Sequence, residues 1–169
     1  MPDKYKVERD IFRHLTDEHG DAALTHRPSK GFATGMDFPG PADYLQGMLT
    51  ALQVARTAEG IARDWARDAR GNGSSWLDIA NALGRMLPRE HEDEDPAINA
   101  FIWVAPRPSM RHDPITTSWR CESCDQRVTD NGPYNSHPED VETGHADDCA
   151  RHRAEIAAWK RRNDWDDED

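Results

Sequence analysis

Three cysteines and one histidine in the C-terminal third of the chain have the spacing of a metal site. Cys121 and Cys124 form a Cys-x2-Cys pair, and His145 and Cys149 form a His-x3-Cys pair. Two thiolates separated by two residues converge on one ion in a tight turn, and this mixed sulfur and nitrogen set suits tetrahedral Zn²⁺. Because four protein ligands leave no position for a substrate water, we expect a structural zinc ion.

The residues around the second ligand pair predict a helix. A stripe of this helix would contain His145, Cys149, His152, Ile156 and Trp159, which follow one another at intervals of 4, 3, 4 and 3 residues. Three alternatives to the Cys₃His set remain open. His152 replaces His145 as the fourth ligand, His137 enters the site from a loop, or the cysteines are free thiols.

Two short strands are expected to precede that helix. Apolar and polar residues alternate from Ile115 to Cys121, and a return strand is expected over 126–129, before the turn at 130–133. Together these elements predict a small ββα zinc-finger module over residues 106–163. Three thiolates and a neutral histidine leave the bound site with a charge near −1, which nearby arginines can offset: Arg120, Arg127, Arg151 and Arg153.

The spacing of apolar residues predicts that the first hundred residues are mainly helical. Helical spacing from Val7 to Leu15 stops at Gly20, and residues 20–41 are rich in proline and glycine, which predicts an irregular connection. Over residues 42–70 the apolar face shifts by about a third of a turn, so we expect two helices that meet at Gly60.

A further helix is expected from Trp76 to Leu83. Ser75 and Asp78 form a capping box at its start, and Gly84 ends it. Residues 97–105 form an apolar segment whose pattern fits either a helix or a strand. The predicted fold class is α+β, in four parts: an N-terminal helix and connection (1–41), a helical domain (42–105), the zinc-finger module (106–163) and an acidic tail (164–169).

The composition narrows the class of protein. The net charge is −11, but residues 90–95 and 164–169 contain five acidic residues each, so the remaining chain has 22 acidic and 21 basic residues. Such runs are usually solvated. No apolar run approaches the roughly 20 residues that span a bilayer. The odd number of cysteines and the charged segment 1–13 lead us to expect a reducing, cytoplasmic location and no membrane partner.

Residues 65–84 resemble the opening of bacterial helix-turn-helix domains, in which a Ser-Trp-x-x-Ile-Ala-x-Ala-Leu-Gly segment precedes the recognition helix. The resemblance implies DNA binding. A separate candidate surface for nucleic-acid or partner contacts is formed by Arg63, Arg67 and Arg70, which lie on one helical face. Asp64 and Asp68 flank these arginines, which also fits a solvated, salt-bridged face. The chain departs from the pattern after Gly84, where five acidic residues would repel DNA phosphates.

The C-terminal motifs resemble those of uncharacterised small zinc-finger proteins from high-GC Gram-positive bacteria and their mobile elements. The shared motifs are Trp119-Arg120-Cys121 with Cys124, Gly132-Pro133-Tyr134, and Gly144-His145-Ala146 with Cys149. The resemblance implies a metal site and brings no known activity with it.

These observations predict a zinc-binding regulatory protein that acts in transcription through DNA or a transcription component. The alternative is a non-catalytic protein-interaction adaptor, an inhibitor or an acidic nucleic-acid mimic. The partner is therefore a protein or DNA, and no small-molecule substrate is indicated. The sequence contains no Gly-rich phosphate loop, His-Glu-x-x-His motif or nucleophile elbow, so we do not expect an enzyme.

Overall fold

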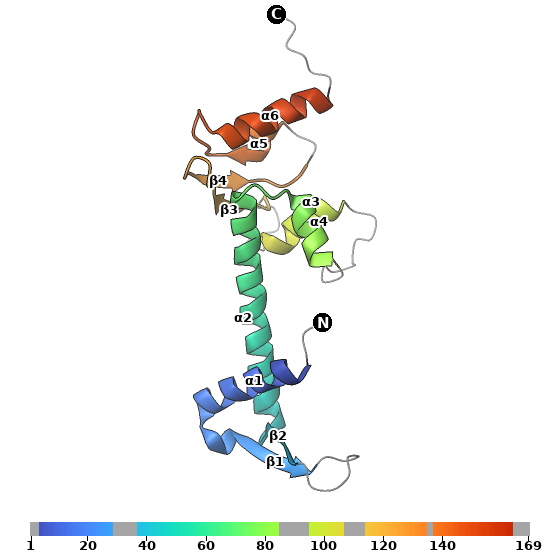
Figure 1. The fold of residues 1–169 in the computed structure, drawn as a ribbon, viewed down its shortest axis with the longest axis vertical. Coiled ribbons are helices and arrows are strands. Elements are labelled where there is room, and N and C mark those ends of the chain that lie inside the picture. The colour runs from blue at the N-terminus through green and yellow to red at the C-terminus, as the bar shows by residue number, and fades with distance from the viewer. Residues whose placement is uncertain (1–3, 29–36, 85–94, 107–113, 135–136, 164–169) are drawn as a thin grey trace, which may run out of the picture. The chain divides into compact units, whose positions relative to one another are not determined.

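The computed structural model describes residues 4–28, 37–84, 95–106, 114–134 and 137–163 (Figure 1). The fold is α+β and mostly helical, as predicted, with one two-stranded and one three-stranded sheet. The chain forms two compact units, residues 1–61 and residues 62–169. No helix in the described ranges is long and apolar enough to cross a membrane.

The first unit is built from a helix and a β-ribbon. Helix α1 (Lys4–His19) is followed by a 3₁₀ turn, η1 (Asp21–Ala23), and by strands β1 (Leu24–Pro28) and β2 (Asp37–Pro41). The predicted helix end is confirmed, because Gly20 has a φ of 79° and its N–H donates to the Thr16 carbonyl.

The prediction of an irregular connection over residues 20–41 is wrong for the two strands. They pair antiparallel, and the prolines are compatible with this ladder because of their register. The Ala42 N–H donates to the Ala23 carbonyl, so the pairs that contain Pro41, Pro39 and Pro28 are those that exchange no hydrogen bonds. Proline therefore removes no donor from this ribbon. Residues 29–36 lie outside the described residues.

The predicted break at Gly60 is also wrong, because helix α2 (Tyr44–Gly71) continues without interruption from the first unit into the second. The prediction assumed that both apolar faces must be buried. Instead, large apolar residues of this helix remain between 43% and 69% exposed: Tyr44, Leu45, Met48, Leu49, Leu52, Ile61 and Trp65. A helix that leaves these faces in solvent does not need a break.

The helical part of the second unit follows the end of α2. Helix α3 (Trp76–Leu83) begins with the predicted capping box, in which Ser75 Oγ accepts from the Asp78 N–H at 3.1 Å and the Asp78 carboxylate accepts from the Ser75 N–H at 2.9 Å. The apolar segment of undecided type is helix α4 (Pro96–Val104), whose N-cap is Asp95.

Helices α3 and α4 pack into one apolar core. Trp76 and Phe101 meet edge to face with ring centroids 5.3 Å apart. The remaining buried members of this core are Ala66, Ile79, Ala80, Ala97, Ala100, Val104 and Ala105. This core holds the C-terminal part of α2 beside the helical pair.

The second unit also contains a three-stranded antiparallel sheet in the order β3-β4-β5. Strands β3 (Thr117–Arg120) and β4 (Arg127–Asp130) confirm the two predicted strands. A short helix, α5 (Pro138–Val141), and strand β5 (Glu142–Thr143) were not predicted, and the final helix is α6 (Ala150–Arg162). The segment expected to be a ββα module is therefore a three-stranded sheet with two helices, in one unit with α3 and α4.

The end of α2 fits closely against the turn that carries the cysteines. The Glu122 N–H donates to the Gly71 carbonyl at 3.2 Å. A Cβ atom on Gly71 would lie 2.2 Å from the Arg120 carbonyl oxygen, which is backbone and cannot move aside easily. Only glycine permits this approach.

We therefore predict opposite effects of the same substitution at two glycines of α2. Gly71→Ala should lower the free energy of unfolding by about 1–3 kcal/mol, as overpacking does. Gly60→Ala is the control, because a Cβ there meets nothing within 4 Å. It should leave stability unchanged or raise it by up to about 1 kcal/mol. Urea denaturation followed by circular dichroism measures both, and equal stability of the two variants would contradict the prediction.

Candidate metal centre

The structure brings Cys121, Cys124, His145 and Cys149 together, with their ligand atoms all within 4.8 Å of one another. The Sγ atoms of Cys121 and Cys149 are 3.9 Å apart, and Cys124 Sγ is 3.7 Å from His145 Nδ1. A tetrahedral ion with metal–sulfur bonds of about 2.3 Å has edges of about 3.8 Å between its ligands. A disulfide would require about 2.05 Å. The four residues therefore fit a tetrahedral metal ion.

The first two ligands lie in a turn at the end of β3. The Cys121 N–H donates to the Gln126 carbonyl at 2.9 Å, and the Asp125 N–H donates to the Cys121 carbonyl at 2.7 Å. Asp125 has a φ of 58°, a conformation that Asp tolerates better than most residues. The Arg120 guanidinium holds its carboxylate through two contacts of 2.5 and 2.6 Å. These bonds stabilise the turn that brings the Sγ atoms of Cys121 and Cys124 into one cluster.

The surroundings of these two thiols differ. Burial raises the pKa of Cys121, although N–H groups of Cys124 and Ser123 oppose this effect. Burial also acts to raise the pKa of Cys124, but N–H groups of Ala146 and Gln126, together with the thiols of Cys149 and Cys121, bring this pKa below its ordinary value. Backbone donors that point at sulfur favour the thiolate, which is the form that binds a metal.

The prediction that His145 and Cys149 share a helix stripe is wrong. Helix α6 begins at Ala150, Cys149 is its N-cap, and His145 precedes it in a loop after β5. Gly144 makes this loop possible, because its φ is 99° and a Cβ there would lie 2.8 Å from the Arg127 carbonyl oxygen. The four-residue spacing is met by a turn, in which the Cys149 N–H donates to the Ala146 carbonyl at 2.9 Å.

Glu142 contacts the histidine of the candidate metal centre. Its Oε2 lies 2.9 Å from His145 Nε2, while Nδ1 of the same ring faces Cys124. The tautomer with its proton on Nε2 donates to this carboxylate and leaves the Nδ1 lone pair for a metal. A carboxylate behind a ligating histidine fixes the ring and raises its basicity, and it is a common partner in metal sites.

The His145 ring is held in its neutral form. Its side chain is only 3% exposed, and burial, with the charges of His152 and Arg151 nearby, lowers its pKa to about 4. Burial raises the pKa of Glu142 to about 7, against the lowering effect of Arg70. A neutral imidazole is the form that donates a lone pair to a metal.

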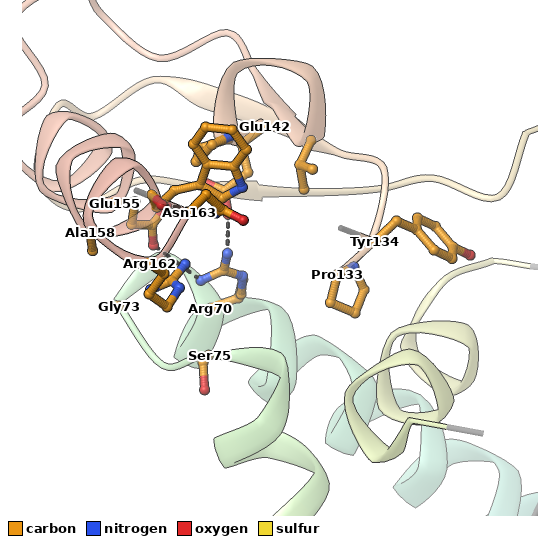
Figure 2. A pocket seen from close by; sticks show the side chains of 13 residues that line it. Arg70, Gly73, Ser75, Pro133, Tyr134, Glu142, Glu155, Ala158, Arg162 and Asn163 are labelled. Atoms are coloured by element: carbon orange, nitrogen blue, oxygen red, sulfur yellow. Dashed lines mark hydrogen bonds and ion pairs between the residues drawn. The ribbon is translucent and has the colours of Figure 1, made fainter. Parts of the chain in front are cut away.

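A buried charge cluster lies behind the site. Arg70, at the end of α2, contacts Glu142 through Nη2 and Asp130 Oδ2 through Nε at 3.4 Å. Asp130 also accepts from the indole N–H groups of Trp76 at 3.0 Å and Trp119 at 3.1 Å. Figure 2 shows Arg70 directed at Glu142, on one side of a cavity of about 580 Å³. The cluster therefore joins α2, α3 and the sheet to the residue that orients His145.

The three arginines named as candidate contacts lie on the packed side of α2. Arg70 is buried in the charge cluster. The Arg67 guanidinium pairs with Asp64 and donates to the Val104 carbonyl at the end of α4, and Arg63 lies over the Trp103 ring at 5.3 Å. The apolar face expected to be inside is turned out instead, since Trp65 is 69% exposed. The sequence correctly predicted which residues share a face of this helix. It was wrong about the buried side, because the arginine face packs and the face with Trp65 is exposed.

The competing histidines are not in the four-residue cluster. His152 stacks on His145 with ring centroids 4.4 Å apart, and its buried Nδ1 has no hydrogen-bond partner among the described residues. Together with Glu142 and His145 it forms a second group that meets the geometric criterion for a metal, which shares His145 with the first. His137 caps α5 and meets Trp159 edge to face.

Sequence reasoning missed the supporting residues Glu142 and Asp130. Glu142 stands three residues before His145, but it has no distinctive spacing from the cysteines. Its part in the site depends on β5, which the sequence did not predict. Arg151 was expected near the site, and its guanidinium stacks on the Trp119 ring at 4.4 Å and pairs with Glu155 at 3.1 Å.

Comparison with protein-family models, with curated proteins and with solved structures found no match. The segment after Gly84, where a recognition helix would stand, and the acidic tail 164–169 lie outside the described residues, as does most of the acidic run 90–95.

We predict that the two stacked histidines differ in their effect on metal content. His145→Ala should abolish or greatly weaken stoichiometric zinc binding, because Nδ1 is the fourth donor. His152→Ala, the matched control, should retain one zinc ion per chain. Elemental analysis of the purified variants measures the content, and full retention by His145→Ala with loss by His152→Ala would reverse the assignment.

A second prediction concerns the orienting carboxylate. Glu142→Gln should lower zinc affinity by roughly 10- to 100-fold, as the loss of such partners does in other metal sites. Glu139→Gln is a suitable control, because Glu139 is exposed on α5 and lies outside the charge cluster. Competition with a chromophoric chelator measures the affinities, and equal values for both variants would exclude a role for Glu142.

Proposed function

We propose that the metal is Zn²⁺ and that its role is structural. The observation that carries this proposal is the convergence of three cysteine sulfurs and one imidazole nitrogen at tetrahedral separations. Thiolate and imidazole donors in this geometry suit Zn²⁺, and hard cations such as Mg²⁺ and Ca²⁺ prefer oxygen. Four protein donors complete the coordination, which supports a non-catalytic role.

The packing around the site supports the same conclusion. Among the described residues, the buried apolar cluster here consists of Trp119, Val128, Cys121 and Cys149, with Cys124 packed against it. So small a cluster contributes little hydrophobic stabilisation, whereas structural zinc contributes on the order of 10 kcal/mol to small domains. We therefore expect the zinc ion to provide, around the cysteines, the stabilisation that a larger apolar core would otherwise provide.

We further propose that the protein is regulatory and acts through a protein partner, a transcription component being one such partner. The arginines that would have contacted DNA are engaged inside the protein, with Arg70 in the charge cluster and Arg67 on the end of α4. The net charge of −11 adds long-range repulsion from phosphates. Both observations favour the protein-interaction alternative over direct DNA binding.

Metal removal tests the structural role of zinc. The purified chain should contain one zinc ion, and chelation at neutral pH should unfold the part of the second unit around β3, β4 and α6, because the apolar cluster there is small. Elemental analysis and hydrogen exchange before and after chelation measure this. If the amides of β3, β4 and α6 stayed protected in metal-free protein, the structural role would be wrong.

The choice of partner has its own test. Binding to random duplex DNA at low salt, where electrostatic attraction is strongest, should be undetectable. Affinity capture from the native host should yield the same partners with and without nuclease treatment. DNA binding that weakens in the Arg63→Gln, Arg67→Gln double variant would instead restore DNA as the partner.

A further inference from the structure

The large apolar residues in the first half of helix α2 lie on a side of the helix that is exposed in the described part of the structure. Leu45, Met48, Leu49 and Leu52 are 68%, 52%, 56% and 48% exposed. They recur at i, i+3, i+4 and i+7, so they form one stripe. At 100° per residue the stripe lies about half a turn from the packed face, which contains Gly47, Thr50 and Val54. We call these four residues the leucine stripe.

The described side chains of the first unit form almost no core of their own. Among residues 4–25 and 39–61, whose side chains the structure describes, only Leu15, Gly47 and Thr50 are buried. A unit of about 60 residues is marginally stable even with a complete core, and such units usually gain stability from disulfides, metals or oligomerisation. Residues 1–61 contain no cysteine. The apolar surface needed for stability is present on the leucine stripe, but it is outside.

The charge distribution favours a second copy of this chain as the partner for this surface. Residues 44–55 contain no charged residue, although 31% of the chain is charged. A partner of opposite charge would therefore find nothing to pair with on the stripe. Residues 1–61 contain seven Lys and Arg and nine Asp and Glu, so most of the net charge of −11 belongs to the remainder of the chain. Two first units can thus meet with little electrostatic repulsion.

We infer that the leucine stripe binds the leucine stripe of a second copy of this chain, and that the protein is a homodimer. An uncharged apolar stripe is self-complementary, as a two-fold interface requires. Its spacing is that of helices that pack side by side, and obligate homodimer interfaces are more apolar than other interfaces. The second copy completes the core that residues 1–61 lack.

The mass of the full, zinc-loaded chain in solution tests this inference. Light scattering coupled to size exclusion should give twice the chain mass of 19.2 kDa. Leu49→Glu should raise the dissociation constant at least about 30-fold, because it places a carboxylate in the middle of an apolar interface. The uncharged double variant Leu45→Gln, Leu52→Gln should weaken the dimer as well.

The matched control is Ala58→Glu. It introduces the same side chain on the exposed surface of the same helix, on the side away from the leucine stripe, and should leave the dimer intact. Zinc content should equal that of the unchanged protein in every variant, and Ala58→Glu should also keep the helix content measured by circular dichroism. Zinc content also separates this inference from the metal proposal, because the stripe and the ligands belong to different units.

Two results would overturn the homodimer. One is a monomeric mass for the unchanged protein at all concentrations up to about 100 µM, a range in which an interface of standard size is occupied. The other is a dimer whose dissociation constant is the same in Leu49→Glu as in the unchanged protein, or rises equally in Ala58→Glu. The second result would show that the copies meet elsewhere.

Discussion

Asp130 and Glu142 are buried carboxylates, and the arrangement of the second unit follows from the need to compensate them. An unpaired buried charge costs several kcal/mol, so each oxygen needs a donor or a positive charge nearby. Asp130 takes its donors from α2, α3, β3 and the Gly132 N–H, and Glu142 takes its own from α2, α6 and the loop before α6. These elements cannot separate without leaving a buried charge unpaired, and this constraint sets their positions.

The same cluster reaches the candidate metal centre through one side chain. One oxygen of Glu142 contacts Arg70 and the other contacts His145. The position of the histidine ligand therefore depends on the end of α2, which is more than seventy residues away in sequence. The apolar cluster around the cysteines is small. The contacts among His145, Glu142 and Arg70 therefore provide stabilisation that apolar packing provides in larger domains. Loss of the metal and loss of the charge cluster should both loosen the same elements.

The two units are stabilised by different means. The second has an apolar helical core, a buried charge cluster and a group of cysteines and a histidine that fits a metal ion. In the described part of the first, Leu15 is the one large apolar side chain that is buried, and the leucine stripe is exposed. Since the hydrophobic effect is the main source of folding free energy, a unit that leaves its largest apolar residues in solvent depends on a partner. Helix α2 contributes to both arrangements, with its apolar residues outward in one half and its arginines inward in the other.

The local features of this protein are determined by its sequence. The capping box at Ser75, the strands on either side of the Cys-x2-Cys turn, and the two candidate ligand pairs each follow from spacing over a few residues, and the structure has them all. Spacing within a helix shows which residues share a face. It does not show which face is buried, and this is why the inward side of α2 was assigned wrongly.

The tertiary structure decided what depends on distant partners. Arg70 is buried because Asp130 and Glu142, 60 and 72 residues away, neutralise it, and no local pattern encodes that match. His145 reaches the metal centre from a loop because β5 brings Glu142 behind it and Gly144 accepts a positive φ. Helical spacing and a tight turn both satisfy a four-residue interval, and only packing against the sheet selects the turn.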